Sequence, residues 1–314
     1  MITSLVSTAH AAWRSLAGVS VGLLVAAVVL HFAKLVSEAR SWHGIVGHAH
    51  HPERVGFRIT CGAFVSAIGA NALLPARVGE ALRVGLIRRR VPNSSAVTLA
   101  ATIVLETGVE VVFGVVVIAA AAGGVRLGNS TSPAHTVTGL ASHPITIAAA
   151  AAVLVTASGL AVRFRAHTRA LLGRMAAGFA ILRAPRAFGT QVLSWKLVAW
   201  TFRFATVYAF LLAFHIPATL WTAVAVVAAQ NIAASIPLLP GNVGTQQAAI
   251  AVALSGVATS GSVLGFGIGM QAATAIFDIA AGAVALCLIV GGRDAFTLLR
   301  HLHLRVRQPV DLHA

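Results

Sequence analysis

One apolar phrase containing a proline occurs twice in this chain and restricts its fold more than any other feature. The pattern Leu-Leu-Pro-x-x-Val-Gly fills residues 73–79 and returns at residues 238–244. Proline removes a backbone donor and clashes with the preceding turn, so each phrase ends the helix before it. Inside a bilayer such a break survives only where protein or water satisfies the freed backbone groups. Its recurrence in both halves of an apolar chain therefore indicates a transport site.

Composition predicts an integral membrane protein. Of the 314 residues, 58% are hydrophobic and 10% are charged, and the mean hydropathy is +0.87. Long apolar stretches of this kind are typical of membrane spans. The net charge is +15, but the basic residues are not interleaved with aromatic residues. We therefore expect cytoplasmic loops that face anionic lipid in a multi-pass protein of the cell membrane, and no nucleic-acid partner.

The apolar pattern divides the chain into long and short helices. Ile59 to Leu74 is only about 24 Å of helix, less than the ~30 Å of the hydrocarbon core. We predict a polar interfacial loop at residues 37–58, although its four histidines leave a metal site as the alternative. The basic residues from Arg163 to Arg186 predict an amphipathic surface helix. The long apolar segments are Leu16–Val36, Val97–Ala122, Ile145–Val162, Val192–Phe214 and Ser262–Val290.

The two halves share one plan, which predicts an all-α polytopic bundle with two internal repeats. Two topologies are open. In the first, eight segments cross the membrane, with 16 basic residues inside and 5 outside. In the second, five segments cross the membrane and each pair of short helices forms a re-entrant hairpin, which makes the two repeats inverted. This topology places 19 basic residues inside and 2 outside. Positive charge accumulates on the cytoplasmic side, so the count favours the hairpins. Residues 1–291 form the membrane domain and residues 292–314 a basic tail.

In the hairpin topology, two short helices begin near the middle of the membrane. Their first amides are unpaired and carry the positive end of the helix dipole, which suits an anion and above all a phosphate. The predicted substrate-binding residues at these helix starts are Arg77, Asn242, Thr245 and Gln246. The predicted hinge residues are Pro75, Gly79, Pro240, Gly241 and Gly244.

Charged residues inside the apolar helices are further candidates for the site. Glu106 and Glu110 are four residues apart and share a helix face. A charge at the bilayer centre costs at least ~2.5 kcal/mol, so both need partners. They either pair with Arg83 or Arg203 and hold the bundle together, or receive a cationic headgroup or a proton. Glu80 and Arg83 can pair on their own helix, and Lys196 lies where it can extend to the interface.

The two phrases also carry a family resemblance. Residues 74–83 and 239–247 resemble the two signatures of the lysylphosphatidylglycerol synthase transmembrane (flippase-like) family. The usual Glu-Arg-x-x-Asp of that family is here Glu106-Thr107-Gly108-Val109-Glu110, and an amide, Gln247, stands near the position of a usual acid. The resemblance implies a lipid translocase-like domain. In bifunctional relatives a soluble aminoacyl transferase follows, but about 24 residues are too few for one.

We therefore expect a protein that moves a phospholipid or a polyprenyl-phosphate-linked lipid between leaflets. The alternative is a non-transporting membrane partner of an envelope glycolipid or cell-wall synthesis enzyme, which the basic segment 163–186 suggests. A lipid-modifying enzyme is a third class, but the sequence offers no nucleophile–base pair for it. Cys61 and Cys287 also lack partners at metal-ligand spacing. Accordingly we expect no enzymatic activity, no metal and no cofactor.

Overall fold

The computed structural model describes residues 12–50, 55–74, 78–91, 94–126, 175–234 and 244–290, and every regular element within these ranges is helical. The first half of the chain contains α2 (Val21–Ala49), α3 (Phe57–Leu73), α4 (Val78–Arg90) and α5 (Ala96–Arg126). The second half contains η1 (Ala180–Arg183), α9 (Pro185–Ala187), the π-helix η2 (Phe188–Leu193), α10 (Ser194–Ala213), α11 (Leu220–Ala234), α12 (Thr245–Ala253) and α13 (Ser260–Val290).

Within the described residues, four helical stretches are long and apolar enough to cross a membrane. They are Val21–Ala49, Ala96–Ala121, Pro185–Ala213 and Ser260–Val290. These stretches confirm four of the five predicted long helices. The remaining prediction, at residues 145–162, lies outside the described residues, as does the first half of the predicted surface helix, residues 163–174. In its described half, the prediction of one continuous helix is wrong, because η1 ends at Arg183 and a new helix, α9, begins at Pro185. Helices α3 and α11 are apolar but shorter, as their sequences indicated.

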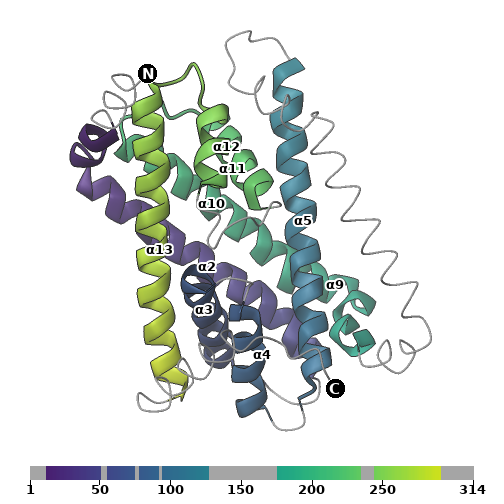
Figure 1. Ribbon diagram of the computed structural model, residues 1–314. Coiled ribbons are helices and arrows are strands. Elements are labelled where there is room, and N and C mark those ends of the chain that lie inside the picture. Colours follow the sequence, from purple (N-terminus) through teal and green to yellow (C-terminus); the bar gives the residue numbers. More distant parts are fainter. Residues whose placement is uncertain are drawn as a thin grey trace, which may run out of the picture.

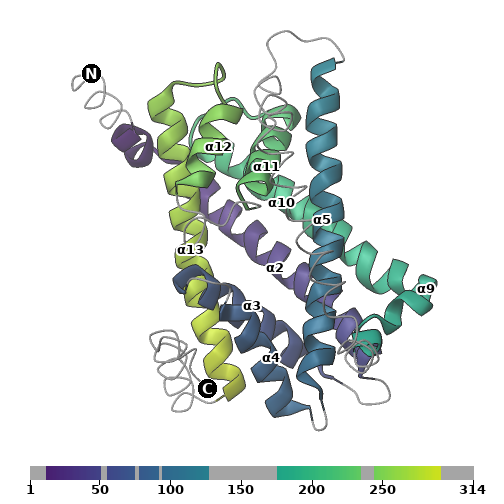
Figure 2. The same cartoon turned by 45° about the vertical axis from the view of Figure 1, so that its right-hand side comes forward.

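The long helices form the frame of the bundle. In Figures 1 and 2, α13 and α5 stand upright on opposite sides, and α2 and α10 run obliquely between them. Helices α2 and α10 pack antiparallel along their lengths. At one end the Ser20 amide donates to the carbonyl of Ala213 (3.0 Å), and at the other the Ser41 hydroxyl donates to the carbonyl of Val192 (3.1 Å). This pair joins the two halves of the chain.

Helix α2 is longer than the sequence predicted. A loop was expected from residue 37, but the helix continues to Ala49. Its polar side chains have partners across the bundle: Trp42 donates to Thr102 on α5 (3.1 Å), and His43 bonds to Thr60 on α3 (3.0 Å). The loop prediction is wrong because these tertiary hydrogen bonds satisfy residues that looked too polar for a buried helix.

Helices α3 and α4 form a pair along the C-terminal half of α13. Gly69 on α3 and Gly282 on α13 bring their backbones together, since a Cβ on Gly69 would lie 2.9 Å from the Gly282 Cα. At the far end of α4, the Arg90 guanidinium donates to the carbonyl of Ile289. The start of α3 and the end of α4 therefore lie at one end of α13, while Gly69, near the end of α3, packs on Asp278 towards the middle of α13.

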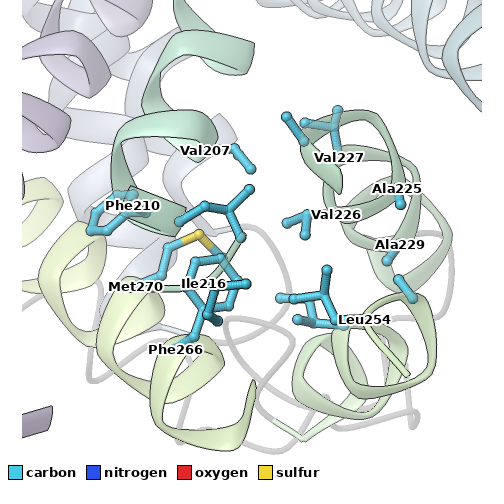
Figure 3. Packing of buried hydrophobic residues seen from close by; sticks show 14 of the residues in the cluster. Val207, Phe210, Ile216, Ala225, Val226, Val227, Ala229, Leu254, Phe266 and Met270 are labelled. Carbon is cyan, nitrogen blue, oxygen red and sulfur yellow. The ribbon is translucent and has the colours of Figure 1, made fainter. Parts of the chain in front are cut away.

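Helices α11 and α12 form a second pair, which lies near the opposite end of the molecule from α3 and α4 (Figures 1 and 2). Gln247, near the start of α12, hydrogen-bonds to Gln271 in the middle part of α13. Apolar side chains of α10, α11 and α13 converge beside it to form the largest buried cluster. Figure 3 shows part of that cluster, including Val207 and Phe210 on α10 and Met270 on α13.

Candidate functional site

At the start of each short helix, α4 and α12, the backbone amide of a glycine donates to the oxygen of a side-chain amide. A Cβ at Gly79 would overlap the carbonyl oxygen of Ala67, so the α3–α4 turn requires glycine there. The Gly79 amide donates to Oδ1 of Asn71 (2.8 Å). Gly244 has φ +88°, which favours glycine, and its amide donates to Oε1 of Gln247 (2.6 Å). These two amides are therefore already occupied and are not open to an anion.

Several predicted site residues belong to the segments that connect these helices. Pro75, Arg77, Pro240, Gly241 and Asn242 lie outside the described residues, so their predicted roles stay predictions. Among the other candidates, Thr245 and Gln246 begin α12, and Glu80 and Arg83 lie on α4. The structure thus places these four described candidates, two at the start of α12 and two on α4.

A chain of alternating charges crosses the interior of the bundle. Arg83 Nη1 lies 3.4 Å from Glu80 and 3.1 Å from Glu106, which connects α4 to α5. Lys196 on α10 lies 3.3 Å from Glu106 and 2.9 Å from Glu110. Arg203 then contacts the other oxygen of Glu110 at 2.9 Å. Three carboxylates and three cations therefore compensate one another inside the protein.

Both arginines of this charge chain also stack on tryptophan. The Arg83 guanidinium carbon is 3.6 Å from the ring centre of Trp42, and the side chain is only 3% exposed. The Arg203 guanidinium lies 4.7 Å from the ring centre of Trp200 and donates to Oδ1 of Asn231 on α11 (3.1 Å). Desolvated cation–π contacts of this kind stabilise a buried guanidinium beyond its ion pairs.

Lys196 is the clearest correction within the charge chain. Its position near a helix end predicted extension to the interface, but its side chain is 1% exposed and bridges both glutamates. That prediction is wrong because α10 continues N-terminally through η2 and α9, which places Lys196 well inside the helical stretch Pro185–Ala213. One signal could have identified it: Lys196 and Arg203 are seven residues apart, two helical turns, and hence face the same way.

A polar cavity of about 230 Å³ lies at one end of this charge chain. Its lining comes from five helices and includes two cations, Lys34 and Arg203, and two amides, Gln230 and Gln246. Thr274, in the middle of α13, also lines it, so the cavity lies near mid-height of that helix. No carboxylate belongs to the described lining, because Glu110 stands behind Arg203 and Glu38 lies 3.7 Å from Lys34.

Thr206 gives this cavity an unused polar group. The residue is 5% exposed and lines the cavity, and its hydroxyl has no hydrogen-bond partner among the described residues. A buried polar group without a partner costs about 1–3 kcal/mol, so such groups are uncommon unless a ligand or water satisfies them. The described lining therefore combines two cations, two amides and a hydroxyl without a partner among the described residues.

One lining residue of the same cavity, His31, is paired with an aspartate that lies outside the lining. His31 on α2 lines the cavity, and Nε2 of His31 lies 2.8 Å from Oδ1 of Asp278 on α13. The two side chains are 10% and 14% exposed. Sequence analysis proposed no role for His31, Lys34, Thr206 or Gln230. The available signal was the spacing of His31 and Lys34, which are three apart and share a helix face.

The predicted site residues therefore fall into two connected groups. Arg203 and Gln246 line the cavity, whereas Glu80, Arg83, Glu106 and Glu110 belong to the charge chain that ends at Arg203. Comparison with curated proteins and with solved structures yields no significant match. A family model described as the lysylphosphatidylglycerol synthase TM region matches residues 2–282 of this chain. The chain therefore belongs to the lysylphosphatidylglycerol synthase TM region family.

Proposed function

We propose that this protein is a lipid translocase-like membrane protein that moves an anionic phospholipid or polyprenyl-phosphate-linked lipid between leaflets. The cavity lined by Lys34, Arg203, Gln230 and Gln246 is the single observation that carries this proposal. Membership in the family supports a role in lipid or envelope metabolism. In this proposal the cavity binds the phosphate of the headgroup while the acyl or prenyl tails stay in the bilayer.

The charge distribution supports an anionic headgroup over a cationic one. A cationic headgroup would need a carboxylate, but Glu106 and Glu110 each already contact two cations. Releasing Glu110 would leave Arg203 without a carboxylate partner among the described residues, and breaking a buried ion pair in this way costs about 3–5 kcal/mol. A phosphate can instead approach Lys34 and Arg203 while accepting hydrogen bonds from the two lining amides.

The size of the cavity also suits a headgroup. Its volume of about 230 Å³ is below the ~300–1,000 Å³ of typical small-molecule pockets. At about 30 Å³ per water molecule, it accommodates roughly seven or eight waters or a phosphate with a small polar substituent. An extended hydrocarbon tail would not fit, so a lipid would bind here through its head alone.

We further infer that the two halves are inverted repeats with re-entrant short-helix pairs. Exchanging the halves matches α2 with α10, α3 with α11, α4 with α12 and α5 with α13. Contacts between elements follow this exchange: α3 packs on α13 as α11 packs on α5, and α4 packs on α5 as α12 packs on α13. The short pairs lie towards opposite ends of the bundle (Figures 1 and 2), as inverted repeats require.

Helix lengths support the same inference. The stretches Val21–Ala49 and Pro185–Ala213 each have 29 residues, and α5 and α13 each have 31. Gly69, near the end of α3, packs on Asp278, and Gln247, near the start of α12, bonds to Gln271, so both lie beside the middle part of α13. Two half-crossing hairpins that meet at a binding site are a recurring arrangement in transporters.

A reconstituted exchange assay tests the proposed function. Purified protein is inserted into liposomes that contain a fluorescent phosphatidylglycerol, phosphatidylcholine or polyprenyl phosphate, and an impermeant reductant bleaches the outer leaflet. We expect the protein to accelerate loss of the protected signal for the anionic lipids more than for phosphatidylcholine. Free glycerol phosphate, added as a competitor, distinguishes recognition of the headgroup alone from recognition of the whole lipid.

Matched variants connect that activity to the cavity. Lys34→Gln removes a lining cation and should slow exchange of the anionic lipids by about 10-fold or more, the effect of one charge-assisted hydrogen bond. Arg186→Gln removes an exposed cation of α9 and should leave the rate unchanged. Absence of exchange for every lipid would refute transport. The non-transporting partner of an envelope synthesis enzyme would then be the better account, and crosslinking from Arg183 and Arg186 would seek that enzyme.

A further inference from the structure

We propose that His31 and Asp278 form a proton-binding site whose protonation is coupled to headgroup binding in the cavity. The inference rests on the proposed function, because it concerns the same cavity. Its basis is the position of the pair: His31 lines the cavity together with Lys34, and Oδ1 of Asp278 lies 2.8 Å from Nε2 of His31. Both residues lie within helices that span the bundle, far from each helix end.

Charge balance provides the first step. Each of the five carboxylates in the described residues lies within ion-pair distance of a base. Four of these carboxylates share four permanent cations, namely Lys34, Arg83, Lys196 and Arg203. The fifth, Asp278, has only His31. With a neutral imidazole this pair carries one negative charge, which costs at least ~2.5 kcal/mol near the centre of a bilayer. One added proton makes the pair neutral.

The hydrogen bond defines where that proton binds. Nε2 of His31 faces the carboxylate, so in the neutral imidazole Nε2–H donates to Oδ1 of Asp278. The remaining lone pair is on Nδ1. A proton taken from water in the cavity forms an Nδ1–H bond and converts the ring to imidazolium, while Asp278 stays ionised. The Phe277 ring lies nearly perpendicular to the imidazole, with 6.0 Å between the two ring centroids, and this packing restricts the orientation of the imidazole.

The surroundings of His31 make this proton sensitive to the headgroup. On α2 the nearest charged group is Lys34, and on α10 it is Arg203, which Glu110 of α5 neutralises. Helix α12 contributes the neutral amide of Gln246. Helix α3 contributes the backbone of Gly69, packed against Asp278. A phosphate that enters this lining brings a negative charge next to the imidazole and therefore favours its protonated form.

The coupling has a definite direction. An anion in the cavity raises the proton affinity of the pair, and by linkage the proton raises the affinity for the anion by the same factor. By this linkage we expect headgroup binding to weaken as the pH rises, because the proton that is taken up with the anion becomes less available. A proton gradient across the membrane would then bias the direction in which the headgroup is released.

Calorimetric titration tests the coupling directly. Wild-type protein in detergent is titrated with dihexanoyl phosphatidylglycerol in two buffers with different ionisation enthalpies, from about pH 5.5 to about pH 8.5. We expect uptake of up to about one proton per lipid at intermediate pH, and a loss of affinity of about 5- to 150-fold across the range. His31→Gln should abolish the uptake and flatten the pH dependence. Asp278→Asn, which retains the side-chain shape, should reduce both.

A matched control separates this site from general histidine titration. His43→Gln removes another histidine of α2, one that bonds to Thr60 away from the cavity, and should leave the proton uptake at its wild-type value. Binding without proton uptake by the wild type, or the same uptake in His31→Gln, would overturn the coupling but leave the proposed function standing. Failure of the lipid to bind wild-type protein at any pH would overturn both.

Discussion

The ammonium group of Lys196 on α10 lies 2.9 Å from Oε2 of Glu110 on α5, although the two residues belong to different halves of the chain. Lys196 is buried between Glu110 and Glu106, and its ammonium group lies 3.3 Å from Oε1 of Glu106. The two glutamates lie four residues apart on α5 and would repel each other without it. Lys196 therefore joins α10 to α5 and keeps the charge chain neutral.

Replacing Lys196 with methionine should destabilise the protein by about 3–5 kcal/mol, because it leaves two buried carboxylates short of a cation. Thermal unfolding in detergent measures the effect. The double variant Lys196→Met/Glu110→Gln should recover part of the loss, since it removes one of the orphaned charges. Arg186→Gln, at an exposed position, should change stability by no more than about 0.5 kcal/mol. An unchanged melting temperature for Lys196→Met would refute the structural role.

Substitution of Gly69 by alanine should separate α3 from α13. The added Cβ would lie 2.5 Å from the carbonyl oxygen of Asp278, a backbone atom that cannot rotate away. Overpacking of this kind costs about 1–3 kcal/mol. Gly85→Ala is the matched control, because a Cβ there meets nothing within 4 Å and alanine is the better helix former. Equal melting temperatures for the two variants would contradict the close contact.

Replacing Thr206 with valine should weaken lipid binding without lowering the stability of the protein. The hydroxyl of Thr206 has no partner among the described residues, so its removal should leave the free energy of unfolding unchanged or raise it by up to about 1–3 kcal/mol. If the hydroxyl contacts the headgroup, the same variant should weaken binding of dihexanoyl phosphatidylglycerol about 5- to 10-fold, the effect of one hydrogen bond. Unchanged lipid affinity would exclude Thr206 from the binding site.

Cysteine labelling should distinguish the two topologies. In a variant in which alanine replaces Cys61 and Cys287, single cysteines are introduced as Gly56→Cys, before α3, and Ser255→Cys, after α12. Both positions are exposed. With re-entrant hairpins, an impermeant maleimide should reach position 56 only from the cytoplasm and position 255 only from outside. The eight-span topology predicts that both react from outside.

The local sequence was sufficient to predict several elements. Helix α3 ends at Leu73, just before Pro75, because proline cannot continue a helix. The length and apolar character of α5 and α13 were evident without knowledge of their neighbours. The need for partners at Glu106 and Glu110 was predictable too, because a lone carboxylate is unstable among apolar side chains.

Other features depended on which helices pack together. The sequence predicted a loop at residues 37–58, but hydrogen bonds from α3 and α5 allow α2 to continue to Ala49. The sequence predicted that Lys196 extends to the membrane interface, but in the structure its side chain is buried between Glu106 and Glu110 of α5. Residues from five helices line the cavity, so no single stretch of the sequence indicates that these residues lie together.

The sequence by itself determined that this chain is a helical membrane protein with two interrupted helices and with embedded charges that require compensation. Those properties follow from hydropathy, proline geometry and the cost of a charge in a bilayer, all of which act locally. Only the tertiary structure decided which polar side chains pair with each other, for example His31 with Asp278, which are 247 positions apart in the sequence. The physical reason is that ion pairs and cavities form between helices, so they depend on how distant segments pack.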